Sequence, residues 1–276
     1  MTRVRLGAVG YLNARPLVYG LEHSPRFDLR FDVPAHCAEL LHGGATDLGL
    51  IPSIEYLRGT GAGSPDDGYA IVPDLAIASR GPVASVALFT RGPVADVRSI
   101  AMDPSSRTSV ALLRVLCRRV FRIAPSFEHR GPDIAAMLAH ADAALIIGDA
   151  ALLIDPADTF RGGAWSAVEK IDLGAAWTEH TGLPFVYAFW AGLPDVLTPR
   201  DVTELQQARN RGVGRSDEIA RAYFALPDEQ AIGARYLRDN IRYSFGSEEQ
   251  AALECFYRYA VEAGVVERTR DLRFYP

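Results

Sequence analysis

Lysine is almost absent from this chain of 276 residues: of its 29 basic residues only Lys170 is a lysine, and the remainder are arginines. Schiff-base chemistry therefore has a single candidate, in a polar stretch, which argues against an enzyme that depends on pyridoxal phosphate. Cysteine is scarce as well, and Cys37, Cys117 and Cys255 lack the paired spacing of a zinc site or a redox dithiol. Since an odd number of cysteines fits no closed disulfide framework, we expect a reducing compartment.

Long hydrophobic runs are also missing. No stretch of about eighteen apolar residues occurs, so no transmembrane helix is predicted, and residues 1–6 run straight into a strand-like segment without the features of a signal peptide. The net charge of −5 argues against a protein that coats nucleic acid or an anionic membrane. We therefore expect a cytoplasmic protein without a nucleic-acid or membrane partner, built from about two domains.

The familiar catalytic motifs are absent too. The chain has no Gly-x-Gly-x-x-Gly after its first strand, no P-loop, no nucleophile elbow and no His-Glu-x-x-His, and its six histidines do not follow a metal-ligand spacing. We expect neither a metal site nor a cofactor. Chemistry without a cofactor, or simple binding, remains.

What the chain does contain is an alternation of short apolar strands with helices, in two sets. The expected strands cover 4–9, 27–33, 48–51, 69–72, 75–79, 84–89, 99–102, 126–129, 143–147 and 183–190. The expected helices cover 16–21, 35–42, 54–58, 105–120 and 133–140, with a surface loop over 59–67. Asn13 is expected in the loop before Pro16, because the residue before a proline is pushed out of the helical region.

Beyond the last strand everything is predicted to be helical. One helix starts at Thr198, a second covers 227–239, and the last begins at Ser247 with a capping box to Gln250. Because this tail has no strands of its own, we expect it to pack on the first lobe. The fold class is therefore α/β, with a discontinuous first lobe of 1–89 plus 188–276, a second lobe of 90–187, and a ligand cleft between them.

Ligands of open α/β sheets bind outside the carboxyl ends of the strands, where helix N-termini point. Two of the segments at such positions contain Asn13, which offers both a donor and an acceptor, and Ser53. A local turn-forming role for Asn13 is an equally good interpretation. For Ser53 an ordinary N-cap is the favoured interpretation.

The other two segments have more polar groups. Several hydroxyls, backbone N–H groups and a guanidinium gather at one predicted helix start, contributed by Ser105, Ser106, Arg107, Thr108 and Ser109. This arrangement favours a carboxylate or phosphate, although a capped, solvated helix start needs only one of those hydroxyls. After the strand over 143–147, Gly148 would allow a ligand to approach the backbone, and Asp149 is equally well explained as an N-cap.

Several segments, taken in order, resemble the menaquinone-biosynthesis proteins of the futalosine route, and among them the chorismate dehydratases. The matching segments are Gly7 to Leu17, Asp47 to Ser53, Ser85 to Phe89, Asp103 to Ser109, Ile146 to Leu152, Trp177, and Thr181 to Val186. The resemblance covers nearly the whole chain. It implies a type II periplasmic-binding-protein-like fold, and a cytoplasmic lyase that removes water from chorismate, a small dicarboxylate, without a cofactor.

The resemblance also implies roles for particular residues. Asn13 and Ser85 are assigned to catalysis: Asn13 would hydrogen-bond the leaving hydroxyl or the developing carbanion, and Ser85 would position the enolpyruvyl carboxylate. The helix start over 105–109 would bind a carboxylate, with Ser53 or the turn at Gly148 and Asp149 nearby. No histidine or lysine base is evident in these segments, so the substrate's own carboxylate is the candidate base.

Two alternatives stay open. A dihydroxynaphthoate synthase of the same route would share the fold. Sequences of that kind, however, have a histidine after the corresponding strand, where this chain has Gly148 and Asp149. A non-enzymatic protein that binds a small carboxylate is the other alternative, and it would normally have a secretory or lipoprotein signal.

Overall fold

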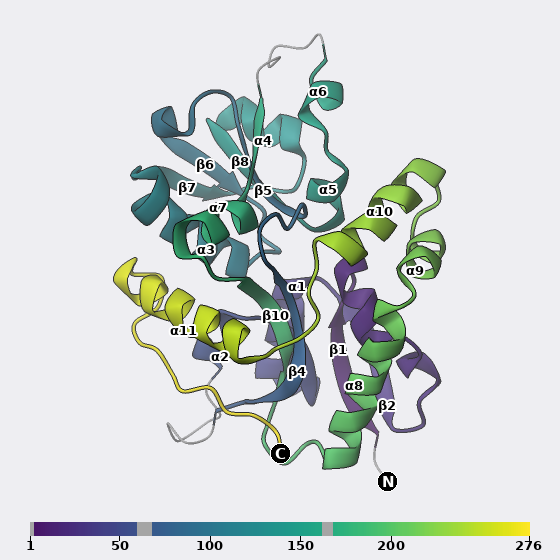
Figure 1. Cartoon of the computed structure of the whole chain (residues 1–276). Coiled ribbons are helices and arrows are strands. Elements are labelled where there is room, and N and C mark those ends of the chain that lie inside the picture. The colour runs from purple at the N-terminus through teal and green to yellow at the C-terminus, as the bar shows by residue number, and fades with distance from the viewer. Residues whose placement is uncertain (1–2, 60–67, 162–167) are drawn as a thin grey trace.

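Two five-stranded sheets form two lobes in this computed structural model, which describes residues 3–59, 68–161 and 168–276 (Figure 1). The first sheet has the order β2 (Phe27–Asp32), β1 (Val4–Val9), β3 (Leu48–Pro52), β10 (Phe185–Gly192) and β4 (Ala70–Ser79). β1 pairs in parallel with β2 and β3, whereas β10 runs antiparallel to β3 and β4. The parallel arrangement predicted for the first three strands is confirmed.

The second sheet repeats this plan. Its order is β7 (Ser126–His129), β6 (Ser99–Met102), β8 (Ala143–Ile147), β5 (Val86–Thr90) and β9 (Glu169–Asp172). β6 is parallel to β7 and β8, and β5 is antiparallel to β8 and β9. The central strands β3, β5, β8 and β10 are buried along their whole length, which is why their sequences are continuous apolar runs rather than alternating ones.

The chain crosses between the sheets twice, before β5 and before β10. β5 lies in the second sheet, so the expected boundary at 89–90 falls at the end of a second-lobe strand. All of β10 lies in the first sheet, so the expected boundary at 187–188 falls inside a first-lobe strand. We propose instead that the lobes divide at 80–85 and 182–184. Apolar runs locate strands, but only the pairing assigns a strand to a sheet.

The helices cover the sheets and the space between them. Those before β10 are α1 (Pro34–His42), α2 (Glu55–Arg58), α3 (Thr108–Leu116), α4 (Ile134–His140), α5 (Gly148–Leu153), α6 (Pro156–Thr159) and α7 (Leu173–Thr181). The π-turn η4 (Cys117–Phe121) extends α3, and the 3₁₀ segments are η1 (Leu12–Val18), η2 (Leu21–His23) and η3 (Val94–Asp96).

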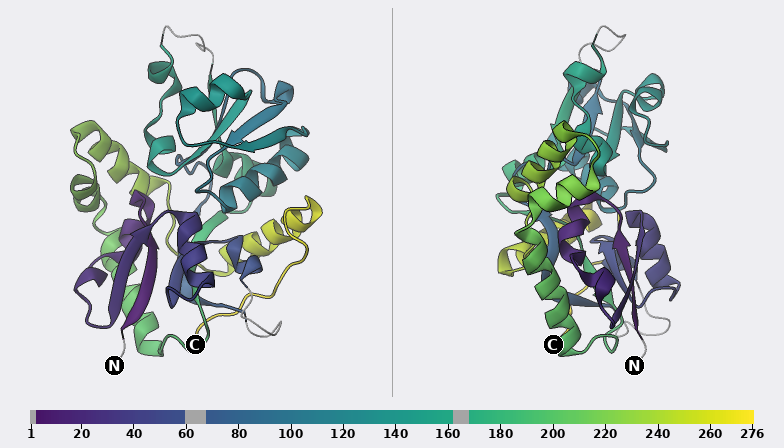
Figure 2. Two further views of the ribbon diagram at one scale, coloured as in Figure 1. Left: turned by 180° about the vertical axis from the view of Figure 1, so that it is seen from behind. Right: turned by 90° about the vertical axis from the view of Figure 1, so that its right-hand side faces the viewer.

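The C-terminal tail is helical, as predicted, and comprises α8 (Pro199–Val213), α9 (Ser216–Tyr223), α10 (Pro227–Asp239) and α11 (Ser247–Glu262). α8, α9 and α10 pack on η1, and α11 packs on β10 and on α3. The left view of Figure 2 shows α8 to α10 on one side of the first sheet and α11 on the other. The tail therefore belongs mainly to the first lobe, and α10 extends toward the second.

Four local predictions are wrong. β4 continues through Pro73 and Asp74, where two strands were expected, because register shifts in its pairing with β10 absorb the irregularity. Helix α3 begins at Thr108 rather than at 105, since a turn closed by the Asp103 carbonyl precedes it. The N-cap of α11 is Gly246, whose N–H donates to the carboxylate of Glu249, so the expected box from Ser247 does not form. Asn13 lies inside η1 rather than in a loop. Most of the surface loop expected over 59–67 lies outside the described residues.

Candidate active site

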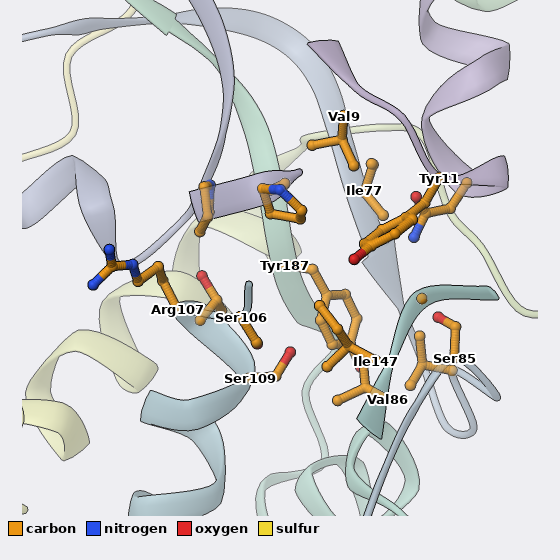
Figure 3. A pocket seen from close by; sticks show the side chains of 17 residues that line it. Val9, Tyr11, Ile77, Ser85, Val86, Ser106, Arg107, Ser109, Ile147 and Tyr187 are labelled. Atoms are coloured by element: carbon orange, nitrogen blue, oxygen red, sulfur yellow. The ribbon is translucent and has the colours of Figure 1, made fainter. Parts of the chain in front are cut away.

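A cavity lies between the lobes, a position where small-molecule sites commonly occur. The first lobe contributes residues at the ends of β1 and β3 and from η1, and the second lobe contributes the end of β8 and the start of α3 (Figure 3). Its lining includes Asn13, Ser85, Ser106, Arg107, Thr108, Ser109 and Gly148. The sequence therefore identified seven residues that the structure brings together at one cavity.

Asn13 reaches the cavity from η1, a 3₁₀ segment that also contains Pro16. The side-chain oxygen Oδ1 of Asn13 is buried and has no hydrogen-bond partner among the described residues. Buried polar atoms nearly always have a partner, so an unpaired acceptor in a cavity wall points to a ligand with a donor.

Ser85 lies in the crossing segment before β5 and is fixed by several hydrogen bonds. Its N–H donates to the carbonyl of Val83 at 2.8 Å, and its carbonyl accepts from the N–H of Gly148 at 2.8 Å. Asp172, the N-cap of α7, accepts from the N–H groups of Val83 and Ala84 and so holds this segment from the other side. The hydroxyl of Ser85 is buried against the hydroxyl of Tyr236, with 2.7 Å between the two oxygens.

The start of α3 forms the opposite wall. No side chain caps this helix, so its first backbone N–H groups have no intrahelical acceptor and their partial positive charge lies at the cavity. Ser106 and Ser109 add hydroxyls, and Figure 3 shows the oxygens of Ser109 and Tyr11 directed into the space between the walls. Thr108 instead accepts a hydrogen bond from the N–H of Ile54, at 3.2 Å, which attaches this helix start to the first lobe.

The guanidinium of Arg107 was expected to hold an anionic ligand, and its direction contradicts that expectation. It forms an ion pair with Glu39 of α1, at 2.9 Å, and Figure 3 shows it turned away from the cavity. Arg107 lines the cavity only through the rest of the residue.

Three predicted residues lie beside the cavity rather than in its lining. The hydroxyl of Ser53 donates to the carbonyl of Val186 at 2.8 Å, and the N-cap of α2 is Ile54, so the N-cap interpretation of Ser53 is wrong as well. The hydroxyl of Ser105 donates to the carboxylate of Asp103 at 2.7 Å. These two serines are occupied by the protein itself.

Asp149 is the third. It lies in the first turn of α5, whose N-cap is Ile147, so it is not the expected cap. Its carboxylate instead crosses to the first lobe, where it accepts from the N–H of Leu12 at 3.2 Å and from the hydroxyl of Tyr223 at 2.5 Å. Burial raises the pKa of Asp149, and the hydrogen bond from Tyr223 acts in the opposite direction. The residue joins the lobes rather than contacting the cavity.

Gly148 was expected to let a ligand approach the backbone, and the structure shows a second reason for glycine. Its φ is +65°, and a Cβ there would lie 2.9 Å from the ring of Tyr11. Glycine at this position allows the aromatic ring of the first lobe to close onto the start of α5.

Three tyrosines at the site were missed: Tyr11 and Tyr187 line the cavity, and the hydroxyl of Tyr236 donates to that of Ser85. Tyr187 is buried, which raises its pKa well above the usual value, and its hydroxyl lies 3.1 Å from that of Ser79. Tyr11 lies within the Gly10 to Pro16 segment, so attention to aromatic side chains there would have found it. Tyr236 gives no local signal, because it is 151 residues from Ser85 along the chain.

Other reactive groups do not form a second centre. In the described ranges no cluster of His, Cys, Asp and Glu has the geometry to hold a metal ion, and Cys37, Cys117 and Cys255 are buried free thiols. Lys170 donates to the carbonyls of Ala151 and Ile154 near the end of α5, so it has a structural role. None of the helices within those ranges combines the length and hydrophobicity needed to span a bilayer.

The chain matches a known protein family along almost its whole length. The model of a family described as menaquinone biosynthesis matches residues 4–262. The chain belongs to this family. A chorismate dehydratase from Thermus thermophilus is 31% identical over an alignment of 260 positions, which covers 91% of this chain and 93% of that protein. A chorismate dehydratase from Campylobacter jejuni is 27% identical and covers 91% of this chain and 95% of its own.

Solved structures extend the likeness in fold. A protein from Archaeoglobus fulgidus superposes on this chain with a TM-score of 0.75 at 17% identity. The superposition covers 96% of this chain and 98% of the Archaeoglobus protein. The periplasmic aliphatic sulphonate binding protein of Escherichia coli gives a TM-score of 0.66 at 18% identity, with 99% and 92% covered. These likenesses confirm the predicted bilobed, periplasmic-binding-protein-like α/β fold.

Proposed function

We propose that this protein is a chorismate dehydratase, a carbon–oxygen lyase that converts chorismate into 3-[(1-carboxyvinyl)oxy]benzoate without a cofactor. Membership of the menaquinone-biosynthesis family and two relatives with that name support the assignment. The single structural observation behind it is the unpaired, buried oxygen of Asn13 in a cavity whose opposite wall is an uncapped helix start.

The chemistry asks little of the protein beyond orientation. The C3–H proton leaves, its electron pair forms the new C3–C4 double bond, and the C4–O bond breaks, so that the hydroxyl departs as water with a proton. The product ring is aromatic, which drives the reaction forward. An enzyme then needs to hold the substrate in the reactive conformation and stabilise the charge that develops.

The two walls match the two ends of such a substrate. A carboxylate fits the N–H groups at the start of α3 together with the hydroxyls of Ser106 and Ser109, because an uncapped helix N-terminus favours an anion. The free oxygen of Asn13 fits a hydroxyl donor such as the C4–OH. Ser85, across the cavity, then contacts the enolpyruvyl carboxylate.

A side-chain base has no candidate in this cavity. Its lining, within the described part of the chain, contains no histidine, lysine, aspartate or glutamate, and its only cation, Arg107, is paired with Glu39. This supports the substrate's own enolpyruvyl carboxylate as the group that removes the C3 proton. The proton then has a short path to the leaving hydroxyl within the substrate.

The partner implied by the proposal is a small dicarboxylate alone. We also place the protein in the cytoplasm, which three free, buried cysteines and a biosynthetic family support.

The test is to incubate the purified protein with chorismate, follow the ultraviolet absorbance and identify the product by mass spectrometry. We expect loss of one water, and a fall in kcat of about 100-fold or more in Asn13→Ala, with a smaller fall in Ser85→Ala. Asn210→Ala, at an exposed site on α8, is the matched control. Binding of chorismate without turnover would favour a carboxylate-binding protein, and cleavage of a futalosine-type substrate instead would favour the dihydroxynaphthoate synthase. Either result would end the proposal.

A further inference from the structure

Tyr11 has a hydroxyl whose hydrogen-bond direction is set by the opposite lobe. The residue is the N-cap of η1 in the first lobe, lines the cavity, and directs its oxygen into the space between the walls (Figure 3). The same oxygen lies 3.3 Å from the hydroxyl oxygen of Ser105 in the second lobe. Ser105 is not part of the cavity lining, so it acts on that space only through Tyr11.

The single hydroxyl proton of Ser105 decides which of the two oxygens is the donor. The Ser105 hydroxyl donates to the buried carboxylate of Asp103 at 2.7 Å, and the Ser105 N–H donates to the same carboxylate oxygen at 2.8 Å. Because that proton is used, the Ser105 oxygen can only accept from Tyr11. The phenolic proton therefore points to the second lobe, and the Tyr11 oxygen can only accept a hydrogen bond from a ligand in the cavity.

Burial and backbone contacts keep this chain of hydrogen bonds in one state. Burial raises the pKa of Tyr11, so its phenol stays protonated across the physiological range. The carbonyl of Ser105 accepts from the N–H of Ala35 at the start of α1, at 3.1 Å, which holds the turn around Ser105 against the first lobe. Because Tyr11 and Ser105 belong to different lobes, the chain is complete only in the closed arrangement.

The cavity thus offers two hydrogen-bond acceptors, the oxygen of Tyr11 and the unpaired Oδ1 of Asn13. The proposed dehydration changes the number of donors that they meet. The C4 hydroxyl of the substrate has one proton, whereas the departing water has two, the second being the proton from C3. The C3–H and C4–O bonds break, one water leaves, and neither side chain gains or loses a proton. One acceptor is enough before the C4–O bond breaks, and the second gains its donor only as water forms.

We propose that Tyr11 is a catalytic residue that accepts the second hydrogen bond of the departing water, and that Ser105 and Asp103 are positioning residues that keep it an acceptor. The inference rests on the proposed dehydration and adds to it the means by which the leaving group is stabilised. An interaction made only as the bond breaks lowers the barrier without strengthening substrate binding.

The first test is kinetic. Tyr11→Phe removes the hydroxyl and keeps the ring that lies against Gly148. We expect kcat to fall about 10- to 100-fold while KM stays within about threefold, because the lost contact is absent from the bound substrate. Tyr243→Phe is the matched control: this tyrosine is buried, its hydroxyl has no partner among the described residues, and it lies outside the cavity lining. Its substitution should leave both constants unchanged.

A double-variant cycle tests the role of Ser105. Ser105→Ala removes the group that receives the Tyr11 proton, and we expect kcat to fall about tenfold. In the Tyr11→Phe background the same substitution should cost nothing more, which a general loss of structure would not reproduce. Ser99→Ala is the matched control, since Ser99 also donates its hydroxyl to a carboxylate of the second lobe, that of Asp142 at 2.9 Å, outside the cavity lining. It should leave kcat unchanged in both backgrounds.

A third measurement does not require turnover. In protein labelled with ¹³C at the ζ carbon of tyrosine, the signal of Tyr11 is assigned by its loss in Tyr11→Phe. We expect Ser105→Ala to shift this signal, because the phenol loses the oxygen to which it donates. Ser99→Ala should leave the signal in place.

The outcomes separate this inference from the proposed function. Full kcat in a Tyr11→Phe variant that is folded by circular dichroism overturns the inference while dehydration by the wild type stands. Equal losses from Ser105→Ala in both backgrounds, or a Tyr11 signal that ignores Ser105→Ala, do the same. Absence of dehydration by the wild type overturns the proposed function, and the role of Tyr11 in it falls as well.

Discussion

The carboxylate of Asp149 on the second lobe accepts a 2.5 Å hydrogen bond from the hydroxyl of Tyr223 on the first. Asp149 also accepts from the N–H of Leu12, one residue before Asn13. Closure of the lobes and placement of the site residues thus share one set of contacts. On the other side of the cavity, the ion pair of Arg107 with Glu39 also joins the lobes.

Removing the Tyr223 hydroxyl should weaken closure without unfolding either lobe. A hydrogen bond to a carboxylate contributes about 1.5–3 kcal/mol, so Tyr223→Phe is expected to raise KM about tenfold or more as the closed state loses population. The measurement is substrate titration together with small-angle X-ray scattering, which should show a larger radius of gyration for the variant.

Tyr19→Phe is the control for this prediction. It also removes a tyrosine hydroxyl bonded to a carboxylate, that of Glu218 at 2.6 Å, but both residues belong to the first lobe. An equal effect of the two substitutions on KM and on the radius of gyration would contradict the role of Asp149 and Tyr223 in closure.

Gly148 provides a second test of the closed arrangement. Gly148→Ala places a Cβ 2.9 Å from the Tyr11 ring and also strains a backbone with φ of +65°. Gly182→Ala, at φ of +70° with nothing within 4 Å of the added atom, has the strain without the clash. We expect both to lose about 1 kcal/mol of stability in urea denaturation, and only Gly148→Ala to lose substrate binding as well. Equal binding by the two variants would show that the contact of Tyr11 with Gly148 is not required.

The sequence located the strands other than β9, the two-lobe plan and seven of the residues that line the cavity, because these follow from local patterns. Buried strands such as β8 are continuous apolar runs, and residues such as Asn13 and Ser109 lie where strands end and helices begin. Tyr236 could not be found this way, since its hydrogen bond to Ser85 depends on how α10 packs against the segment before β5. A helical tyrosine with apolar neighbours is ordinarily a core residue.

The role expected for Arg107 was wrong for a related reason. A guanidinium at a helix start favours an anion, but the anion it binds here is Glu39, a side chain of the other lobe. The pairing requires the relative placement of the two lobes, which no local pattern contains. Asp149 was misassigned in the same way, because Leu12 and Tyr223 are its partners.

The corrected role of Arg107 makes its own prediction. Both partners of the ion pair are substantially exposed, with 40% of the Arg107 side chain and 58% of that of Glu39 accessible, so the pair is screened by solvent and contributes at most about 1 kcal/mol. We expect Arg107→Ala and Glu39→Ala to raise KM equally, within about fivefold, and the double variant to add nothing.

Arg91→Ala is the matched control, because it removes an exposed ion pair with Asp142 inside the second lobe. If Arg107 instead held a substrate carboxylate, Arg107→Ala would raise KM far more than Glu39→Ala does. Substrate titrations of these four variants at low and high salt distinguish the results, since the effect of the interlobe pair should fade as salt rises.

The attachment of the C-terminal helices makes stability depend on pH. Asp201 at the start of α8 receives two hydrogen bonds from the Arg26 guanidinium, at 2.7 and 2.9 Å, and this contact lowers the pKa of Asp201 from 3.8 to about 2. Because folding favours the ionised carboxylate, the stabilisation is complete above pH 3.8 and is lost as the pH falls toward 2.

Asp201→Asn should therefore lower the free energy of unfolding by up to about 2 kcal/mol at pH 7. The difference from wild type should shrink between pH 4 and pH 2 in urea denaturation. Asp217→Asn, which removes an exposed pair with Arg238, should show neither effect. A constant deficit of Asp201→Asn across this pH range would mean that the ionised carboxylate does not stabilise the fold.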